Sequence, residues 1–222
     1  MLRYLLLFMV LIAAGCGPAA APAPPPIQPD SMIPLPAPAT DGQTSIEAAL
    51  AQRRSVREFS ARPLTDAELG QLLWAAQGIT DQTGYRTAPS AGALYPLEIY
   101  VATGDGLFHY EVDRHALATL DRTDLRPALH QAALRQGAVS QAPALFVIAA
   151  VYQRTAGKYG AERSPRYVHL EAGHAAQNLL LQAVALGLGA VPIGAFDDTD
   201  VQRVLNLPAE EEPLYLIPVG QP

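Results

Sequence analysis

One short run of this 222-residue sequence carries the residue types that bind anionic or planar ligands: RRSVR, residues 53–57. In an extended chain, side chains two residues apart point to the same side, so Arg53, Ser55 and Arg57 would share a face, with Arg54 beside them. Guanidinium groups present forked, planar donors that suit phosphate or ring carbonyl oxygens. The run therefore predicts a ligand-binding face, and a solvated basic turn is the alternative.

Two further stretches are built from small residues. In the run Pro89, Ser90, Ala91 and Gly92, the successive backbone N–H groups after the proline face no bulky side chains, and such a nest can lie against a flat ligand. The VPIGAF run exposes backbone in the same way, between two predicted helices, at Pro192, Gly194 and Ala195. A plain turn before a strand and a simple helix connector are the respective alternatives.

A third set of polar residues, His169, Glu171 and His174, suggests a metal site at first sight. Zinc-binding helices place two histidines four residues apart on one face. Here the spacing is five, which turns the second ring about 140° around the helix. The sequence therefore predicts no metal site, and instead a buried polar network that includes Gln177 and Asn178 at a subunit interface.

The elements that must position these residues lie within one predicted domain, residues 45–222. Thr65 and Glu68 form a capping-box pattern that opens a helix ending near Gln77. Apolar patterning and turn residues predict the other elements. They are helices starting at residue 46 and over 114–120, 125–136, 167–186 and 198–205, and strands over 97–101, 107–112, 144–152 and 213–220. This mixture without regular alternation predicts an α+β fold with helices on a mixed sheet.

The composition excludes one class of partner. The formal net charge is −6, which argues against nucleic acid as the main ligand. The length suggests a single domain large enough to bury a core.

The first 16 residues have the layout of a secretory signal: Arg3, a short apolar run, then small residues before Cys16. They resemble a bacterial lipoprotein signal, which implies lipidation of Cys16; an ordinary cleaved signal with an incidental cysteine is the alternative. Residues 17–44 are rich in Pro and Ala and predict a stiff tether. We therefore expect an exported protein, anchored to a membrane and facing the periplasm or cell exterior.

Four separated blocks of the domain resemble the nitroreductase family, and within it the SagB-type dehydrogenases of azole-forming peptide pathways. The blocks are RRSVREF, PSAGALYPLEIYV, GKYG with RYVHLEAGHAAQNLLLQAVALGLGAVPIGAF, and LYLIPVG, in the family's order. The resemblance implies non-covalently bound FMN and an α+β homodimer with two sites at the subunit interface.

The resemblance also assigns roles to residues. It implies that Arg53, Ser55 and, with them, Arg54 hold the FMN phosphate and ribityl chain, and that Arg57 contacts the pyrimidine edge. The Pro89–Gly92 nest would pack against the flavin from the partner subunit. Pro192, Gly194 and Ala195 would lie over the ring, with a backbone N–H near the flavin N5. Lys158 and Tyr159 match a pair that abstracts a proton in azoline-oxidising relatives.

One departure from the family concerns the end of the chain. Many members carry a basic residue after the last strand, whereas this chain ends Gly220-Gln221-Pro222. The expected function is an FMN-dependent oxidoreductase that transfers hydride between a small-molecule or peptide-derived substrate and flavin. A non-catalytic flavin- or ligand-binding lipoprotein of the same fold is the alternative.

Overall fold

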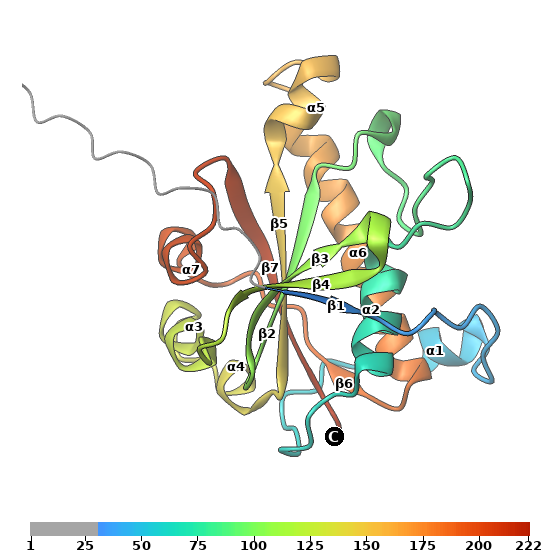
Figure 1. The fold of residues 1–222 in the computed structure, drawn as a ribbon, viewed down its shortest axis with the longest axis vertical. Helices are drawn as coiled ribbons and strands as arrows, with labels where there is room; N and C mark the ends of the chain where they lie inside the picture. The colour runs from blue at the N-terminus through green and yellow to red at the C-terminus, as the bar shows by residue number, and fades with distance from the viewer. Residues whose placement is uncertain (1–30) are drawn as a thin grey trace, which may run out of the picture.

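A computed structural model describes residues 31–222, which form a seven-stranded sheet with helices on both faces (Figure 1). All strand pairs are antiparallel, so the sheet is antiparallel rather than mixed as predicted. Ser55, which lies outside the strands, forms an isolated parallel bridge with Ala190. The strands, in spatial order, are β1 (Met32–Pro34), β4 (Ala116–Asp121), β3 (Gly106–Glu111), β2 (Leu97–Thr103), β5 (Ala144–Val151), β7 (Glu211–Gly220) and β6 (Gly189–Ala190).

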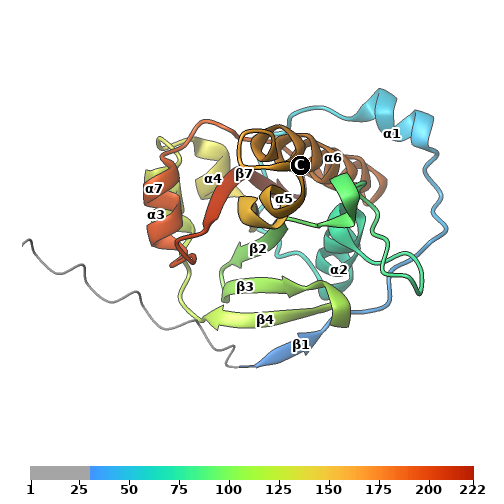
Figure 2. The ribbon, with the colours of Figure 1, turned by 90° about the horizontal axis from the view of Figure 1, so that it is seen from above.

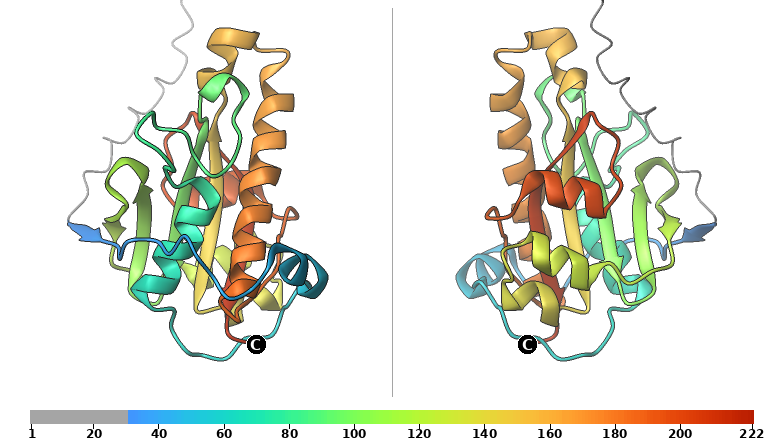
Figure 3. Two further views of the ribbon diagram at one scale, coloured as in Figure 1. Left: turned by 90° about the vertical axis from the view of Figure 1, so that its right-hand side faces the viewer. Right: turned by 90° about the vertical axis from the view of Figure 1, so that its left-hand side faces the viewer.

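The helices form two layers (Figures 2 and 3). One layer consists of α1 (Ile46–Gln52), α2 (Asp66–Gln77) and α6 (Ser164–Ala185), and the other of α3 (Arg126–Ala132), α4 (Gly137–Gln141) and α7 (Asp198–Val204). Helix α5 (Tyr152–Tyr159) continues directly from the end of β5 and packs on α6. Two 3-10 turns complete the set, η1 (Ala91–Ala93) and η2 (Val112–Arg114).

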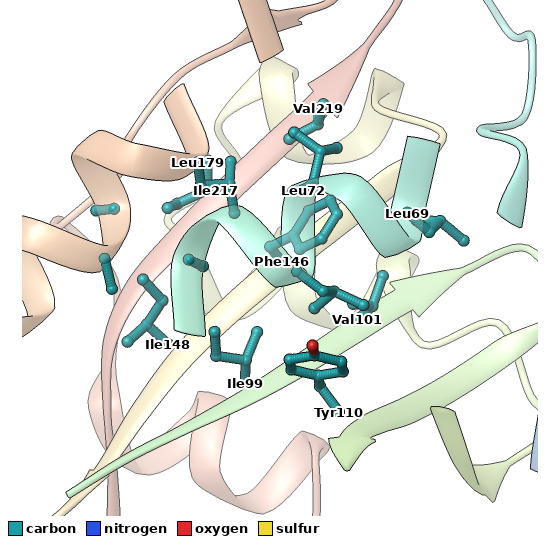
Figure 4. Close-up of a cluster of buried hydrophobic side chains, with 14 of the residues drawn as sticks. Leu69, Leu72, Ile99, Val101, Tyr110, Phe146, Ile148, Leu179, Ile217 and Val219 are labelled. Atoms are coloured by element: carbon teal, nitrogen blue, oxygen red, sulfur yellow. The ribbon is translucent and has the colours of Figure 1, made fainter. Parts of the chain in front are cut away.

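The central strand β5 contributes to both cores, because successive side chains of a strand point to opposite faces. Phe146 and Ile148 lie in the core under α2 and α6, which Figure 4 shows. Leu145 and Val147 lie in the core under α3, α4 and α7. The continuous apolar run therefore predicted a buried central strand correctly.

Local signals in the first half of the domain are also confirmed. Thr65 accepts a hydrogen bond from the Glu68 amide, and the Glu68 carboxylate accepts one from the Thr65 amide, at the start of α2. Strands β2 and β3 form the expected hairpin, in which Thr103 pairs with Gly106.

The predicted helix over 114–120 is wrong, because Ala116–Asp121 is β4, paired with β3 and β1. The helix preference of alanine is a weak local effect. Pairing with β3 and β1 in a buried position outweighs it. The predicted helix over 125–136 is too long. Helix α3 ends at Ala132, and left-handed backbone at Leu134 and Arg135 separates it from α4.

The predicted tether is wrong for its last part. Met32–Pro34 pairs with β4, and Leu35 is buried against the α2 core. Three paired residues are enough to hold this segment on the sheet edge, although their composition resembles a linker. Cys16, the rest of the predicted signal and residues 17–30 of the predicted tether lie outside the described residues. Within residues 31–222, no helix is both long and apolar enough to span a bilayer.

Candidate functional site

The arginine-rich run is extended and lies beside β6. Ser55 forms the parallel bridge with Ala190, and the Val56 amide donates to the Ala190 carbonyl at 3.0 Å. A Cβ on Gly189 would lie 2.6 Å from a Val56 methyl carbon, so glycine is required for this close approach. The structure thus brings the RRSVR run next to the segment that leads into the VPIGAF run.

A pocket of about 230 Å³ lies between the end of α1 and the end of α6. Arg53 and Arg54 line it, over apolar side chains that include Leu180 and Val184. Arg57 lies outside this lining and donates weakly to the Ser55 carbonyl at 3.4 Å. Within residues 31–222, no carboxylate pairs with Arg53, Arg54 or Arg57, so their charges are available to an anionic ligand.

The VPIGAF run follows the edge of β7 and then leaves it. Ile193 pairs with Leu216, whereas Gly194 and Ala195 are exposed. Neither the Gly194 nor the Ala195 N–H donates to a protein acceptor in the described part of the chain. Pro192 is half-buried at the start of this loop. The loop therefore presents free backbone donors on the same sheet edge as Ser55.

A residue that the sequence reasoning missed holds this loop. Gln136 donates through Nε2 to the carbonyls of Ala195 at 2.7 Å and Ala133 at 3.0 Å. It follows Leu134 and Arg135, whose φ angles are 55° and 58°. No sequence signal marks this turn, because it contains neither glycine nor asparagine at the left-handed positions.

Replacing Leu134 with glycine is expected to stabilise the fold by about 1 kcal/mol. A left-handed backbone costs an L-residue steric energy that glycine avoids, and the Leu134 side chain is 64% exposed, so little burial is lost. Urea unfolding measures the difference. Leu134→Ala is the matched control, because it removes the same side chain and keeps the strain. Equal stability of the two variants would contradict the prediction.

The Pro89–Gly92 loop meets Lys158 and Tyr159, the pair at the end of α5. Gly92 has a φ of 66°, and a Cβ built on it would lie 2.8 Å from Lys158 Nζ and 3.0 Å from the Tyr159 hydroxyl. Ser90 Oγ accepts from the Tyr95 amide at 2.9 Å, which closes the turn around Ala91, while Pro89 is exposed. The small residues therefore let an amine and a phenol lie against this loop.

Helix α5 is fixed to this loop and to the sheet by Arg154. Its guanidinium donates to the Tyr95 carbonyl at 3.0 Å and pairs with Glu98 on β2. Lys158 lies one turn further along the same helix face. Glu98 also contacts His109 Nε2 at 2.8 Å, and Glu111 contacts Nδ1 at 2.9 Å.

Both ring nitrogens of His109 face carboxylates, so the protonated ring can donate a hydrogen bond to each of them. Burial would lower the pKa of His109, but the hydrogen bonds to Glu98 and Glu111 outweigh it and raise the pKa. Burial would likewise raise the pKa of Glu98, but His109 and Arg154 lower it. The carboxylate of Glu98 and the cationic groups beside it thus favour each other's charged forms.

His109→Gln is expected to destabilise the protein by about 2 kcal/mol at pH 6. The folded pKa lies above the ordinary 6.5, so the stabilisation is complete below pH 6.5 and is lost as the pH rises through the folded value. The difference between the variant and the wild type should therefore shrink at alkaline pH in urea unfolding. His130→Gln is the control, since its ring makes no hydrogen bond within residues 31–222. A gap that grows with pH would contradict this account.

The predicted polar network on α6 is only partly formed. Glu171 is buried, and its carboxylate accepts a hydrogen bond from Gln77 Nε2 at 3.5 Å. Asn178 Nδ2 donates to the Thr87 carbonyl at 3.3 Å. His169 instead contacts the Tyr152 hydroxyl at 2.7 Å, and His174 is exposed. In the described residues, no three potential metal ligands come together.

Tyr152 and His169 line a second pocket of about 480 Å³ with Asp198, Glu212 and Leu214. Burial and the charges of Glu212 and Asp198 raise the pKa of Tyr152 to about 12. None of the predicted ligand-binding residues lines this pocket.

The predicted site residues fall into two half-sites at different levels of the sheet. Half-site one, Arg53–Arg57 with Pro192–Ala195, follows the outer edge at β6 and β7. Half-site two, Pro89–Gly92 with Lys158 and Tyr159, lies where β2 begins and β5 ends. Ala144 at one end of β5 pairs with Val219, and Ala150 at the other pairs with Glu212. The eight residues of β5 span about 23 Å, and Figure 1 shows α5 and β6 at opposite ends of the sheet, so the two half-sites of one chain lie apart.

Comparison with known proteins identifies the family to which this fold belongs. The nitroreductase family profile matches residues 50–221. A Methanocaldococcus jannaschii protein whose name assigns it to the nitroreductases is 45% identical over 185 residues, which cover 81% of this chain and 92% of that protein. The trifolitoxin-processing protein TfxB of Rhizobium leguminosarum bv. trifolii is 30% identical over 133 residues, which cover 55% of this chain and 35% of TfxB.

A crystal structure of a Ralstonia eutropha JMP134 protein, also assigned by name to the nitroreductases, superposes with a TM-score of 0.77 at 31% identity. The match covers 86% of this chain and 89% of that one. With a family match over most of the chain, close relatives at nearly full length and the same α+β architecture, this protein is an oxidoreductase that belongs to the nitroreductase family.

Proposed function

We propose that this protein is an FMN-dependent dehydrogenase whose complete site forms between two copies of the chain. The observation that carries the proposal is the separation of two chemically complementary half-sites. One supplies cations and free N–H donors, and the other supplies an amine and a phenol beside a small-residue loop. A flavin needs the first set, and proton removal from a substrate needs the second.

The residues of half-site one fit FMN. Arg53 and Arg54 suit a phosphate, because they line a pocket with an apolar floor and have no carboxylate partner in the described chain. The N–H groups of Gly194 and Ala195 suit an electron-rich ring edge. Pro222 also lines the arginine pocket.

A second copy would cover apolar surface that one chain leaves exposed. Ala49 on α1 is buried, but Ile46 and Leu50 on the same helix are more than half exposed, and so is Leu170 on α6. Helices α1 and α6 pack together. A symmetric pairing through this surface would bury these side chains twice and place each half-site two against the partner's half-site one.

FMN held by the residues of half-site one would supply a hydride acceptor for the substrate. Lys158 accepts the substrate proton, and the Tyr159 hydroxyl orients the Lys158 amine. The Lys158 Nζ lies 5.7 Å from the centre of the Tyr159 ring. One C–H bond and one X–H bond of the substrate break and a double bond forms. The similarity to TfxB, a toxin-processing protein by name, favours a peptide-derived substrate.

The test is to purify the protein and record its visible spectrum, its mass in solution and its anaerobic response to candidate substrates. A flavin spectrum in a dimer, bleached by a heterocycle-containing peptide, is expected. Bound flavin that no substrate bleaches would favour the non-catalytic alternative. A colourless protein that binds no added FMN would refute the proposal.

Arg53→Ala is expected to weaken FMN binding about 10- to 100-fold, because a charge-assisted hydrogen bond to phosphate is lost. Equilibrium dialysis of the flavin-depleted protein measures the affinity. Arg122→Ala removes an equal charge from the exposed end of β4 and is the control. Equal FMN affinity of both variants would place the phosphate elsewhere.

We also propose that the protein is exported and anchored through Cys16, on the evidence of its first 16 residues alone. Nicotinamide cofactors are not expected outside the cytoplasm, and this favours substrate dehydrogenation over nicotinamide oxidation. Incorporation of labelled acyl chains that is lost in Cys16→Ala tests the anchor. Labelling that persists in the variant would contradict it.

A further inference from the structure

The loop from Gly194 to Phe196 is fixed at both ends. The Ile193 amide donates to the Leu216 carbonyl at 2.8 Å, and the Asp197 amide donates to the Ala132 carbonyl at 2.9 Å. Between these anchors, none of the three loop N–H groups donates to a protein acceptor within residues 31–222. A contact in the middle of the loop therefore limits how its peptide groups rotate.

The middle of the loop is held by Gln136. Its amide uses both protons on backbone carbonyls, at 2.7 Å to Ala195 and at 3.0 Å to Ala133. In a planar trans peptide the carbonyl and the following N–H point in opposite directions. Holding the Ala195 carbonyl toward Gln136 therefore turns the Phe196 N–H away from it, and limits the rotation of the Ala195 peptide.

The backbone that delivers Gln136 is strained. Leu134 and Arg135 are consecutive non-glycine residues with left-handed φ angles. Immediately after them, the Gln136 backbone N–H donates to the Ala133 carbonyl at 3.2 Å, and Gln136 is the N-cap of α4. Strain of this kind persists where the surrounding structure requires one geometry, and it gathers at functional sites. Here the strained turn places a single side chain against the loop of half-site one.

We propose that Gln136 is a positioning residue that orients the N–H donors of Gly194–Phe196 toward the bound flavin and so raises its reduction potential. The inference rests on the FMN site proposed above. Reduced flavin carries more electron density than oxidised flavin, so donors held in place stabilise the reduced form more. Gln136 acts through the loop and needs no contact with the flavin.

The decisive variant is Gln136→Glu, which keeps the size of the side chain and replaces the donor amide by a carboxylate that repels the Ala195 carbonyl. Gln141→Glu is the matched control. It introduces the same charge at the exposed end of the same short helix, and it leaves Ala195 untouched. Gln136→Asn, one methylene shorter, tests the reach of the amide.

Two measurements on the full-length protein separate positioning from simple stabilisation. Hydrogen exchange on flavin-free protein reports loop mobility, and the Asp197 amide should exchange at least tenfold faster in Gln136→Glu. The midpoint potential of bound FMN should fall, by about 30 mV for a tenfold loss of preference for reduced flavin. Gln141→Glu should match the wild type in both measurements.

The outcomes are distinguishable. Faster exchange with an unchanged potential would make Gln136 a structural clamp only and overturn the inference. Unchanged exchange and potential would overturn it as well. If the wild type itself binds no FMN, the proposed function fails and the inference fails with it, whereas a flavin-bound wild type with equal potentials in all variants leaves the proposed function intact.

Discussion

Lys158→Met should slow anaerobic substrate dehydrogenation about 10²- to 10⁴-fold while leaving flavin bound. The amine lies against the Gly92 loop at the end of α5, away from the arginine pocket, so its loss removes a proton acceptor and no flavin contact within one chain. Methionine retains most of the side-chain volume. Stopped-flow bleaching of the flavin at saturating substrate measures the rate, and the flavin absorbance before mixing measures occupancy.

Two companion variants make this result specific. Tyr159→Phe removes only the hydroxyl and should cost less, because Lys158 remains. Arg163→Met removes another exposed cation near the start of α6 and should have no comparable effect. A Lys158→Met protein that reduces at the wild-type rate would return the residue to a packing role. A reduction rate whose rise with pH is lost only in Lys158→Met would support proton transfer to Lys158.

Local patterns in the sequence predicted the elements that depend on near neighbours. The Thr65–Glu68 capping box, the hairpin at Thr103–Gly106 and the buried run of β5 each depend on contacts that the pattern itself encodes. Ala116–Asp121 was mispredicted because its conformation is decided by two strands from elsewhere in the chain. Met32–Pro34 was mispredicted for the same reason.

In the candidate site, too, some residues were predicted from the sequence and others were not. Gly92 was singled out as a position of close approach, and the structure supplies the side chains that approach it, Lys158 and Tyr159. Gln136 escaped notice because a glutamine before a short helix carries no signal. Its importance arises from the left-handed turn at Leu134 and Arg135 and from a partner 59 residues away in the chain.

Mixing Arg53→Ala with Lys158→Met, at an FMN concentration too low to fill the Arg53→Ala site, should restore activity if the site is shared between subunits. Arg53→Ala keeps half-site two intact, and Lys158→Met keeps half-site one intact. In a mixed dimer, the arginine face of the Lys158→Met subunit meets the intact Lys158 of its partner, so one of the two sites is complete. Random reassociation of equal amounts yields mixed dimers in half of the population, and therefore roughly a quarter of the wild-type activity.

The mixing experiment distinguishes a Lys158 that serves the flavin of its own chain from one that serves the partner's flavin. Single substitutions give the same result in both cases. If Lys158 served the flavin of its own chain, each site in a mixed dimer would carry one defect, Arg53 or Lys158, and mixing would add nothing to the two parent activities. The separation of about 23 Å along β5 favours sharing, because no side chain bridges it. Reassociation is confirmed by mass with differently tagged subunits, and a mixture of each variant with itself gives the baseline. Verified mixed dimers without added activity would refute the shared site, while the flavin site at Arg53 would still stand on its own binding data.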